Sequence, residues 1–251
     1  MSSNTAYKRQ SSRTPAMSNS ARRSTALAAG LLGLTAIVGG GQLFFSGIAH
    51  YQAQAFLKHW EQSPSQPSEQ AGIVAEHAIK RAIQAYPGSN GEYLETLGYI
   101  EQWRAFGADL NDPNALQHRH AAVQALREST QARHTWPDAW AALAFAKLTV
   151  LEFDDEFTQA MQQAQHFGPW RIGINRRIAE IGLFAHSELN PEQRAITAES
   201  MQRTAQYSAK EQAQLFELAH KTNALAPLCS ALTEQYPACT PLALPETLQH
   251  D

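Results

Sequence analysis

Apolar side chains recur along most of the chain at the spacing of an α-helix. The clearest stripe runs from Ala75 to Tyr86, with apolar residues at intervals of three and four. Pro87 and the glycine-containing turn over 88–91 end this helix. No stretch alternates apolar and polar residues for long enough to predict a strand. The pattern therefore predicts an all-α protein.

Breaks rich in proline, glycine and asparagine divide the rest of the pattern into further helices. The Asn190-Pro191 pair, for example, is typical of a helix start. We interpret residues 69–222 as one helical domain, followed by a proline-rich tail over 223–251. Within the domain, after the first stripe, we expect helices over 92–106, 115–132, 138–151, 154–167, 170–186, 191–206 and 208–222.

A longer apolar run near the N-terminus predicts a membrane span. Residues 25–49 carry no charge, and a helix needs roughly 20 mainly apolar residues to cross the hydrocarbon layer. A cleaved signal peptide is the alternative, since Gly47 and Ala49 suit a cleavage site, although the run exceeds the usual apolar core of such peptides. We expect a transmembrane helix over 25–49, a disordered tail over 1–24, and a juxtamembrane segment with a linker over 50–68.

Charge is distributed unevenly along the chain, whose net charge is −3. Residues 1–60 contain six Lys or Arg and no Asp or Glu, so the rest carries a net charge of about −9. Positive residues before a span favour a cytoplasmic N-terminus, which places the acidic domain on the other side. An acidic domain has no evident electrostatic footprint for nucleic acid, and we expect no nucleic-acid partner.

The two cysteines, Cys229 and Cys239, are ten residues apart in the C-terminal tail. A metal site would need more ligands at closer spacing. Outside the cytoplasm the surroundings are oxidising, so a disulfide between these cysteines is the expected use.

The middle of the chain resembles the tetratricopeptide repeat. The first helix of that repeat carries Trp at its fourth position, Leu at the seventh and a small residue at the eighth. The resemblance covers about 85–170, fades near 170–174, and implies a stack of antiparallel helix pairs. The matching residues are Trp140, Leu143 and Ala144, and again Leu94, Leu97 and Gly98.

This resemblance also implies a binding groove, because the first helix of each pair lines the concave face of such a stack. Aromatic rings beside carboxylates and amides suit a peptide or a sugar chain. For Trp103 and Phe145, a position in the core between helix pairs is the alternative. The implied groove residues are Glu92, Glu95, Tyr99, Gln102, Trp103, Asp138, Phe145, Arg171 and Asn175.

Common catalytic and cofactor signatures are absent, including the nucleophile elbow, the zinc-protease motif and the phosphate-binding loop. His118 and His120 diverge on a helix and do not share a metal. The acidic run over 154–156 lies at a predicted helix start, where capping is expected rather than paired catalytic carboxylates. We expect no enzyme activity, no cofactor and no metal.

The basic tail, the single span and three segments together resemble the VpsP-type proteins of bacterial exopolysaccharide gene clusters. The segments are AYPGSNGEYLETLGYIEQW, WPDAWAALAFAKLTVLEFDDEF and FGPW. The resemblance implies a single-pass inner-membrane protein with a periplasmic helical domain. Its expected function is that of a scaffold or adaptor in exopolysaccharide biosynthesis or export, with protein components of that complex or a glycan as partners. The alternatives are a translocon-associated or envelope quality-control adaptor and, less favoured, a glycan-processing enzyme.

Overall fold

The computed structural model describes residues 19–62, 65–233 and 236–240. These residues form α-helices and one short 3₁₀-helix, without a strand among them, which confirms the all-α prediction. Predictions for 1–18, 63–64, 234–235 and 241–251 lie outside the described residues. The helices are α1 (Asn19–Gln62), α2 (Glu69–Ala85), α3 (Gly91–Arg104), α4 (Pro113–Ala132), α5 (Pro137–Thr149), α6 (Asp155–Phe167), α7 (Ile172–Phe184), α8 (Pro191–Tyr207), α9 (Ala209–Lys221), α10 (Leu225–Ala231) and η1 (Pro237–Cys239).

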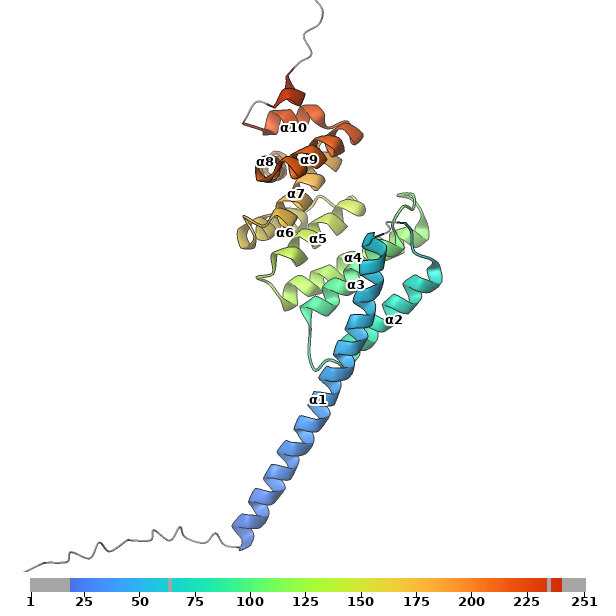
Figure 1. Cartoon of the computed structure of the whole chain (residues 1–251), viewed down its shortest axis with the longest axis vertical. Helices are drawn as coiled ribbons and strands as arrows, with labels where there is room; N and C mark the ends of the chain where they lie inside the picture. Colours follow the sequence, from blue (N-terminus) through green and yellow to red (C-terminus); the bar gives the residue numbers. More distant parts are fainter. Residues whose placement is uncertain (1–18, 63–64, 234–235, 241–251) are drawn as a thin grey trace, which may run out of the picture.

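Helix α1 is much longer than the predicted span. Its apolar side chains are exposed as far as Phe45, and among the described residues it is the helix long and apolar enough to cross a membrane. Figure 1 shows the N-terminal half of α1 projecting from the rest of the molecule. The helix starts at Asn19, inside the predicted tail, and runs to Gln62.

The second half of α1 belongs to the helical domain, where it packs against α2 and α3. The juxtamembrane segment expected over 50–68 is therefore helical through Gln62 in the structure. The reason is that small and apolar residues continue past the uncharged run at helical spacing and bury one face. The buried residues on this face are Ser46, Ala49, His50, Ala53, Leu57 and Trp60.

The helices after α1 form a stack in which α3 packs on α4, α5 on α6 and α7 on α8. In Figure 1 the stack rises from α2 to α10. Helices α3 to α9 end within about two residues of the predicted positions. That these pairs repeat with tetratricopeptide geometry stays a prediction.

Side-chain caps explain why the helices begin where they do. Each capping oxygen accepts a hydrogen bond from a backbone N–H in the first turn, which otherwise has no partner. Asn190 and Gln193 form a reciprocal capping box at the start of α8. The other capping residues are Ser68, Asn90, Asp112, Asp154 and Ser208.

The C-terminal end of the stack contains two elements that periodicity did not predict, α10 and η1. A disulfide joins Cys229 in α10 to Cys239 in η1, with 5.4 Å between their Cα atoms. The ring of Tyr236 packs against Phe216 of α9, with 5.6 Å between centroids. These contacts hold the described part of the tail against the last helix of the domain.

Close approach of α3 and α4 depends on Gly98, which provides a stability test. A Cβ atom at Gly98 would lie 2.5 Å from Cγ of Leu126, a fully buried residue. We expect Gly98→Ala to lower the free energy of unfolding by about 2 kcal/mol through overpacking, despite a helix-propensity gain of up to ~1 kcal/mol. Urea denaturation measures the change.

Gly173 in α7 provides the control, because no atom lies within 4 Å of its ideal Cβ position. We expect Gly173→Ala to leave stability unchanged or to raise it by up to about 1 kcal/mol. Equal effects of the two substitutions would contradict the close approach at Gly98.

Candidate functional site

The structure brings several predicted groove residues together on one face of α3, α5 and α7. The Tyr99 hydroxyl of α3 donates to the Glu95 carboxylate at 3.2 Å. Phe145 of α5 lies 4.4 Å from the guanidinium of Arg177 in α7, measured to the ring centroid. Tyr99 and Phe145 both pack against one hydrophobic cluster that includes residues of α5 and α7, and the charge of Asp138 on α5 acts on the Glu95 carboxyl. We call the surface formed by Glu95, Tyr99, Asp138, Phe145 and Arg177 the α3/α5/α7 face.

Two further predicted groove residues lie at the edge of this face. Arg171 Nη1 lies 2.7 Å from Asp138 Oδ2, so the two neutralise each other. Glu92 is exposed in the first turn of α3.

Three of the predicted residues lie elsewhere. Trp103 packs against Trp60 of α1, with 6.2 Å between ring centroids. Gln102 is partly buried, and its Nε2 has no hydrogen-bond partner among the described residues. Asn175 is buried and donates to the carbonyl oxygen of Pro169 at 2.9 Å. The assignment from the repeat pattern did not account for α1, which packs against α3 on the Trp103 side.

The buried carboxyl of Glu95 has a pH-dependent consequence. Burial raises its pKa to about 7, although the hydrogen bond from Tyr99 opposes this and Asp138 adds to it. As the pH rises, Glu95 therefore keeps its proton to a higher pH in the folded state than in the unfolded chain, where its pKa is near 4.5. The stability from this proton is complete below about pH 4.5 and is lost as the pH rises to about 7.

We expect Glu95→Gln to remove this loss, so that at pH 8 the variant is more stable than the wild type by about 3 kcal/mol. Glutamine keeps an oxygen that accepts the Tyr99 hydrogen bond. Thermal denaturation between pH 4 and pH 8 measures the effect. Parallel pH profiles for variant and wild type would mean that Glu95 is charged in the folded state.

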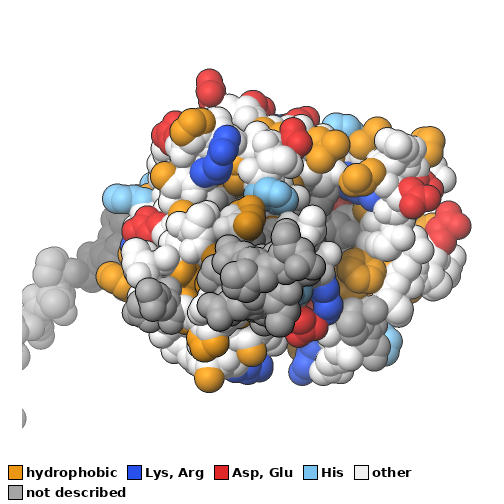
Figure 2. Space-filling model, turned by 90° about the horizontal axis from the view of Figure 1, so that it is seen from above, with side chains coloured by type: hydrophobic (Ala, Val, Ile, Leu, Met, Phe, Trp, Pro, Cys, Tyr) orange, Lys and Arg blue, Asp and Glu red, His pale blue; other side chains and the backbone are white. Residues whose placement is uncertain are grey.

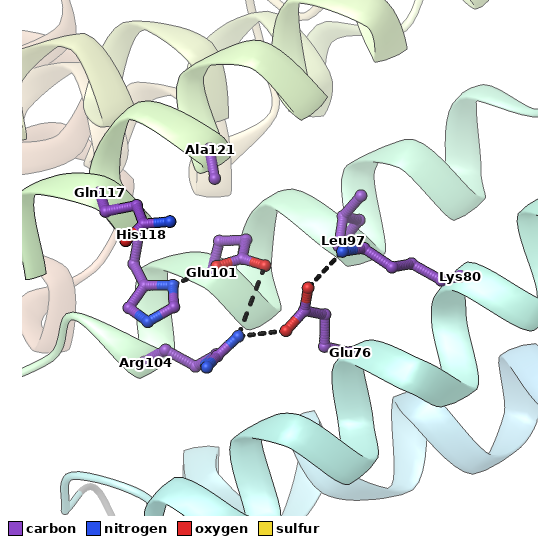
Figure 3. Close-up of a pocket in the computed structure, with 8 residues that line it drawn as sticks. All are labelled: Glu76, Lys80, Leu97, Glu101, Arg104, Gln117, His118 and Ala121. Atoms are coloured by element: carbon purple, nitrogen blue, oxygen red, sulfur yellow. Dashed lines mark hydrogen bonds and ion pairs between the residues drawn. The ribbon is translucent and has the colours of Figure 1, made fainter. Parts of the chain in front are cut away.

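A second candidate site is a charged cavity between α2, α3 and α4, with a volume of about 450 Å³ (Figure 3). Glu76 of α2 pairs with Lys80 one turn later and with Arg104 of α3. On the other side of Arg104, Glu101 Oε2 lies 2.6 Å from His118 Nδ1 of α4. Leu97 and Ala121 contribute the apolar part of the wall.

Helical spacing explains how these groups meet. Glu76 and Lys80 are four residues apart on α2, and Glu101 and Arg104 are three apart on α3, so each pair shares one helix face. Packing of α4 against α3 then adds His118. A neighbouring cavity of about 340 Å³ shares Arg104, Gln117 and His118. Sequence reasoning missed this site, because its charges come from three separate helices.

The pKa values of the two carboxyl groups in the cavity are shifted in opposite directions. Burial raises the pKa of Glu101, and the hydrogen bond with His118 offsets part of that shift. For Glu76 burial also acts upward, but the hydrogen bond from Lys80 and the charge of Arg104 outweigh it and lower the pKa. Since the cations already have acidic partners, the cavity suits a ligand that offers both hydrogen-bond donors and acceptors, such as a peptide segment.

A third charged cluster lies around Lys147 of α5, whose side chain is 1% exposed. Its Nζ contacts carboxylate oxygens of Glu152, Asp154 and Glu156 at 2.8–2.9 Å. Asp154 also accepts a hydrogen bond from the backbone N–H of Phe157, which confirms its predicted capping role. The acidic run therefore caps α6 and neutralises a buried lysine at the same time.

The surface seen from the α10 end carries mixed side chains. Figure 2 shows acidic, basic and apolar groups interspersed around the residues drawn in grey, without a continuous basic patch on the visible part of that face. Among the described residues, no group of three or more His, Cys, Asp or Glu is arranged to hold a metal ion.

Comparison of the chain with protein-family models, curated proteins and solved structures gave no match.

Proposed function

We propose that this chain is a membrane-anchored adaptor without enzymatic activity. Its α1 helix spans the membrane, and its helical domain binds a partner at the membrane surface. The observation that carries the proposal is the continuity of α1. One unbroken helix exposes its apolar side chains up to Phe45, and from Ser46 onward one of its faces is buried against the domain. Such an anchor confines the domain to the membrane, which raises the effective concentration of any partner held there.

The basic residues before the span favour a cytoplasmic N-terminus and a domain on the opposite side. The resemblance to VpsP-type proteins supports a periplasmic location and a partner from an exopolysaccharide-synthesis complex. The resemblance to tetratricopeptide repeats supports capture of a protein segment by the stacked helices. For the partner-binding surface we propose the charged cavity of α2, α3 and α4, with the α3/α5/α7 face as the competing surface.

Gln117 allows a test of the cavity that leaves its ion pairs in place. This residue is exposed, lines both neighbouring cavities and is not part of the ion pairs that hold the site together. We expect Gln117→Arg to fill the entrance and to reduce partner recovery severalfold when the solubilised chain is purified from its native cell. Gln131→Arg is the matched control, since Gln131 is exposed near the other end of α4.

The proteins recovered distinguish the candidate functions. Polysaccharide-synthesis components support the proposal, whereas translocase or folding factors would favour a quality-control adaptor. If Arg177→Ala releases the partner and Gln117→Arg does not, the α3/α5/α7 face is the binding surface. Glycan cleavage that Glu101→Gln abolishes would instead identify an enzyme with Glu76 and Glu101 as its carboxyl groups.

A further inference from the structure

The contacts of α1 determine which edge of the domain lies nearest the bilayer. Ser46, the residue after Phe45, is fully buried, and its hydroxyl donates to the Ala82 carbonyl in the last turns of α2 at 3.1 Å. One turn later, His50 Nε2 lies 3.0 Å from the Thr96 hydroxyl of α3. The end of α2 and the start of α3 therefore flank the residues that leave the membrane.

The length of the apolar run fits this position. Residues 25–45 form about 21 residues of helix, or roughly 31 Å at 1.5 Å per residue, which matches the hydrocarbon thickness of a bilayer. Arg81 donates to the Gln52 side chain at 3.2 Å, and Gln52 is only about 10 Å along the helix from Phe45. The end of α3 lies far from the apolar run, because its Trp103 packs against Trp60, which is roughly 22 Å beyond Phe45 along α1.

The turn between α4 and α5 lies on the same edge. The Ser129 hydroxyl near the end of α4 donates to the carbonyl oxygen of Gly91, the first residue of α3, at 2.7 Å. Arg133 packs so closely against Gly91 that a Cβ atom there would lie 2.6 Å from the Arg133 Cγ. The Arg133 guanidinium in turn lies 4.1 Å from the Trp136 ring centroid.

We infer that the edge formed by the α2–α3 turn, residues 86–90, and the α4–α5 turn, residues 133–136, rests in the lipid headgroup layer. The inference of this membrane-facing edge depends on the membrane anchorage that we propose above. Because α1 enters the domain without a break, no linker separates this edge from the bilayer.

The side chains on this edge have the chemistry of a headgroup contact. Tyr51 is 74% exposed just beyond the span, and Tyr86 and Trp136 are partly exposed, as aromatic residues at membrane interfaces commonly are. Arg81 and Arg133 provide cations for lipid phosphates. Glu92 is an exposed carboxylate in the first turn of α3, and the two arginines outnumber it.

Site-specific fluorescence quenching tests this orientation on the full chain. Single cysteines at Ser89, Thr135 and Asn111 each carry a fluorophore, with the native disulfide kept oxidised. All three residues are exposed in turns, but Asn111 lies between α3 and α4 at the opposite edge. The chain is reconstituted in nanodiscs of phosphatidylcholine and phosphatidylglycerol that contain a headgroup-nitroxide lipid. We expect severalfold stronger quenching at Ser89 and Thr135 than at Asn111.

A fourth label at Leu34, in the exposed half of α1, separates the two possible failures. With a nitroxide on the acyl chain, quenching at Leu34 reports the span itself. Quenching at Leu34 together with equal, weak headgroup quenching at Ser89, Thr135 and Asn111 would overturn the membrane-facing edge and leave the anchor intact. Absence of quenching at Leu34 would overturn both proposals.

Discussion

Lys147→Met is expected to lower the free energy of unfolding by about 3 kcal/mol, because it removes one partner of a buried ion cluster. Methionine keeps most of the apolar stem, so the loss reports the charge rather than a cavity. Without the ammonium group, the carboxylates of Glu152, Asp154 and Glu156 face one another around an empty position. Urea denaturation measures the change in stability.

The control is Lys221→Met in α9. Lys221 pairs with Glu217, and their side chains are 68% and 64% exposed. Exposed pairs one helical turn apart contribute little, so we expect no measurable change in stability. A Lys147 variant as stable as the wild type would show that the cluster does not hold the α5–α6 turn.

Acid should weaken the same cluster. Bidentate hydrogen bonds from Arg127, at 2.6 and 2.7 Å, together with Lys147, lower the pKa of Glu156 to about 2. A carboxyl group whose pKa is depressed on folding stabilises the protein above its unfolded pKa, and this stability is lost as the pH falls. We expect a loss of about 2 kcal/mol between roughly pH 4.5 and pH 2, which Glu156→Gln removes from the pH profile of unfolding.

Truncation within α1 should have the other large effect. A fragment of residues 46–251 keeps the half of α1 that packs on the domain, and we expect it to be folded and soluble. A fragment of residues 63–251 loses Ala53, Leu57 and Trp60 and uncovers the apolar face of α2. We expect it to aggregate or to lose cooperative unfolding, as circular dichroism and light scattering would report.

A point substitution provides a milder version of this test. Trp60 is 5% exposed and packs against Phe56 and Trp103. Trp60→Ala in the 46–251 fragment should cost about 3 kcal/mol of stability, as expected for a buried aromatic residue. If residues 63–251 alone melt like residues 46–251, the second half of α1 is not part of the domain.

The helices from α2 to α9 could be predicted because their signals are local. Apolar spacing identified their faces, and helix-start signals such as Asp154 and Asn190 marked where they begin. Helix α10 could not be predicted in this way, since it has only seven residues and contains Pro227. Its position depends on packing against α8 and α9, which local periodicity does not report.

The length of α1 was underestimated for a physical reason. The predicted span ends near Ala49, where the apolar run ends. A helix, however, continues as long as its backbone groups find hydrogen-bond partners within it. One part of such a helix can be buried in lipid and the next part in protein. Ala53, Leu57 and Trp60 continue the helical spacing beyond the predicted span and carry the signal that the prediction missed.

The candidate sites were only partly predictable. The repeat resemblance predicted that Glu95, Tyr99 and Phe145 lie on one face, and the structure brings them together. It misplaced Asn175, whose side-chain amide donates to the turn before α7. The charged cavity and the buried Lys147 depend on side chains from separate helices and turns. A charge on a helix does not show from sequence alone which other helix neutralises it.

The central claim is that α1 is at once a membrane span and a structural helix of the domain. Alkaline carbonate extraction of membranes from cells that make the full chain or the 46–251 fragment tests it most directly. We predict that the full chain stays with the membranes and that the fragment is released as a folded, soluble protein. Release of the full chain as well would contradict the claim.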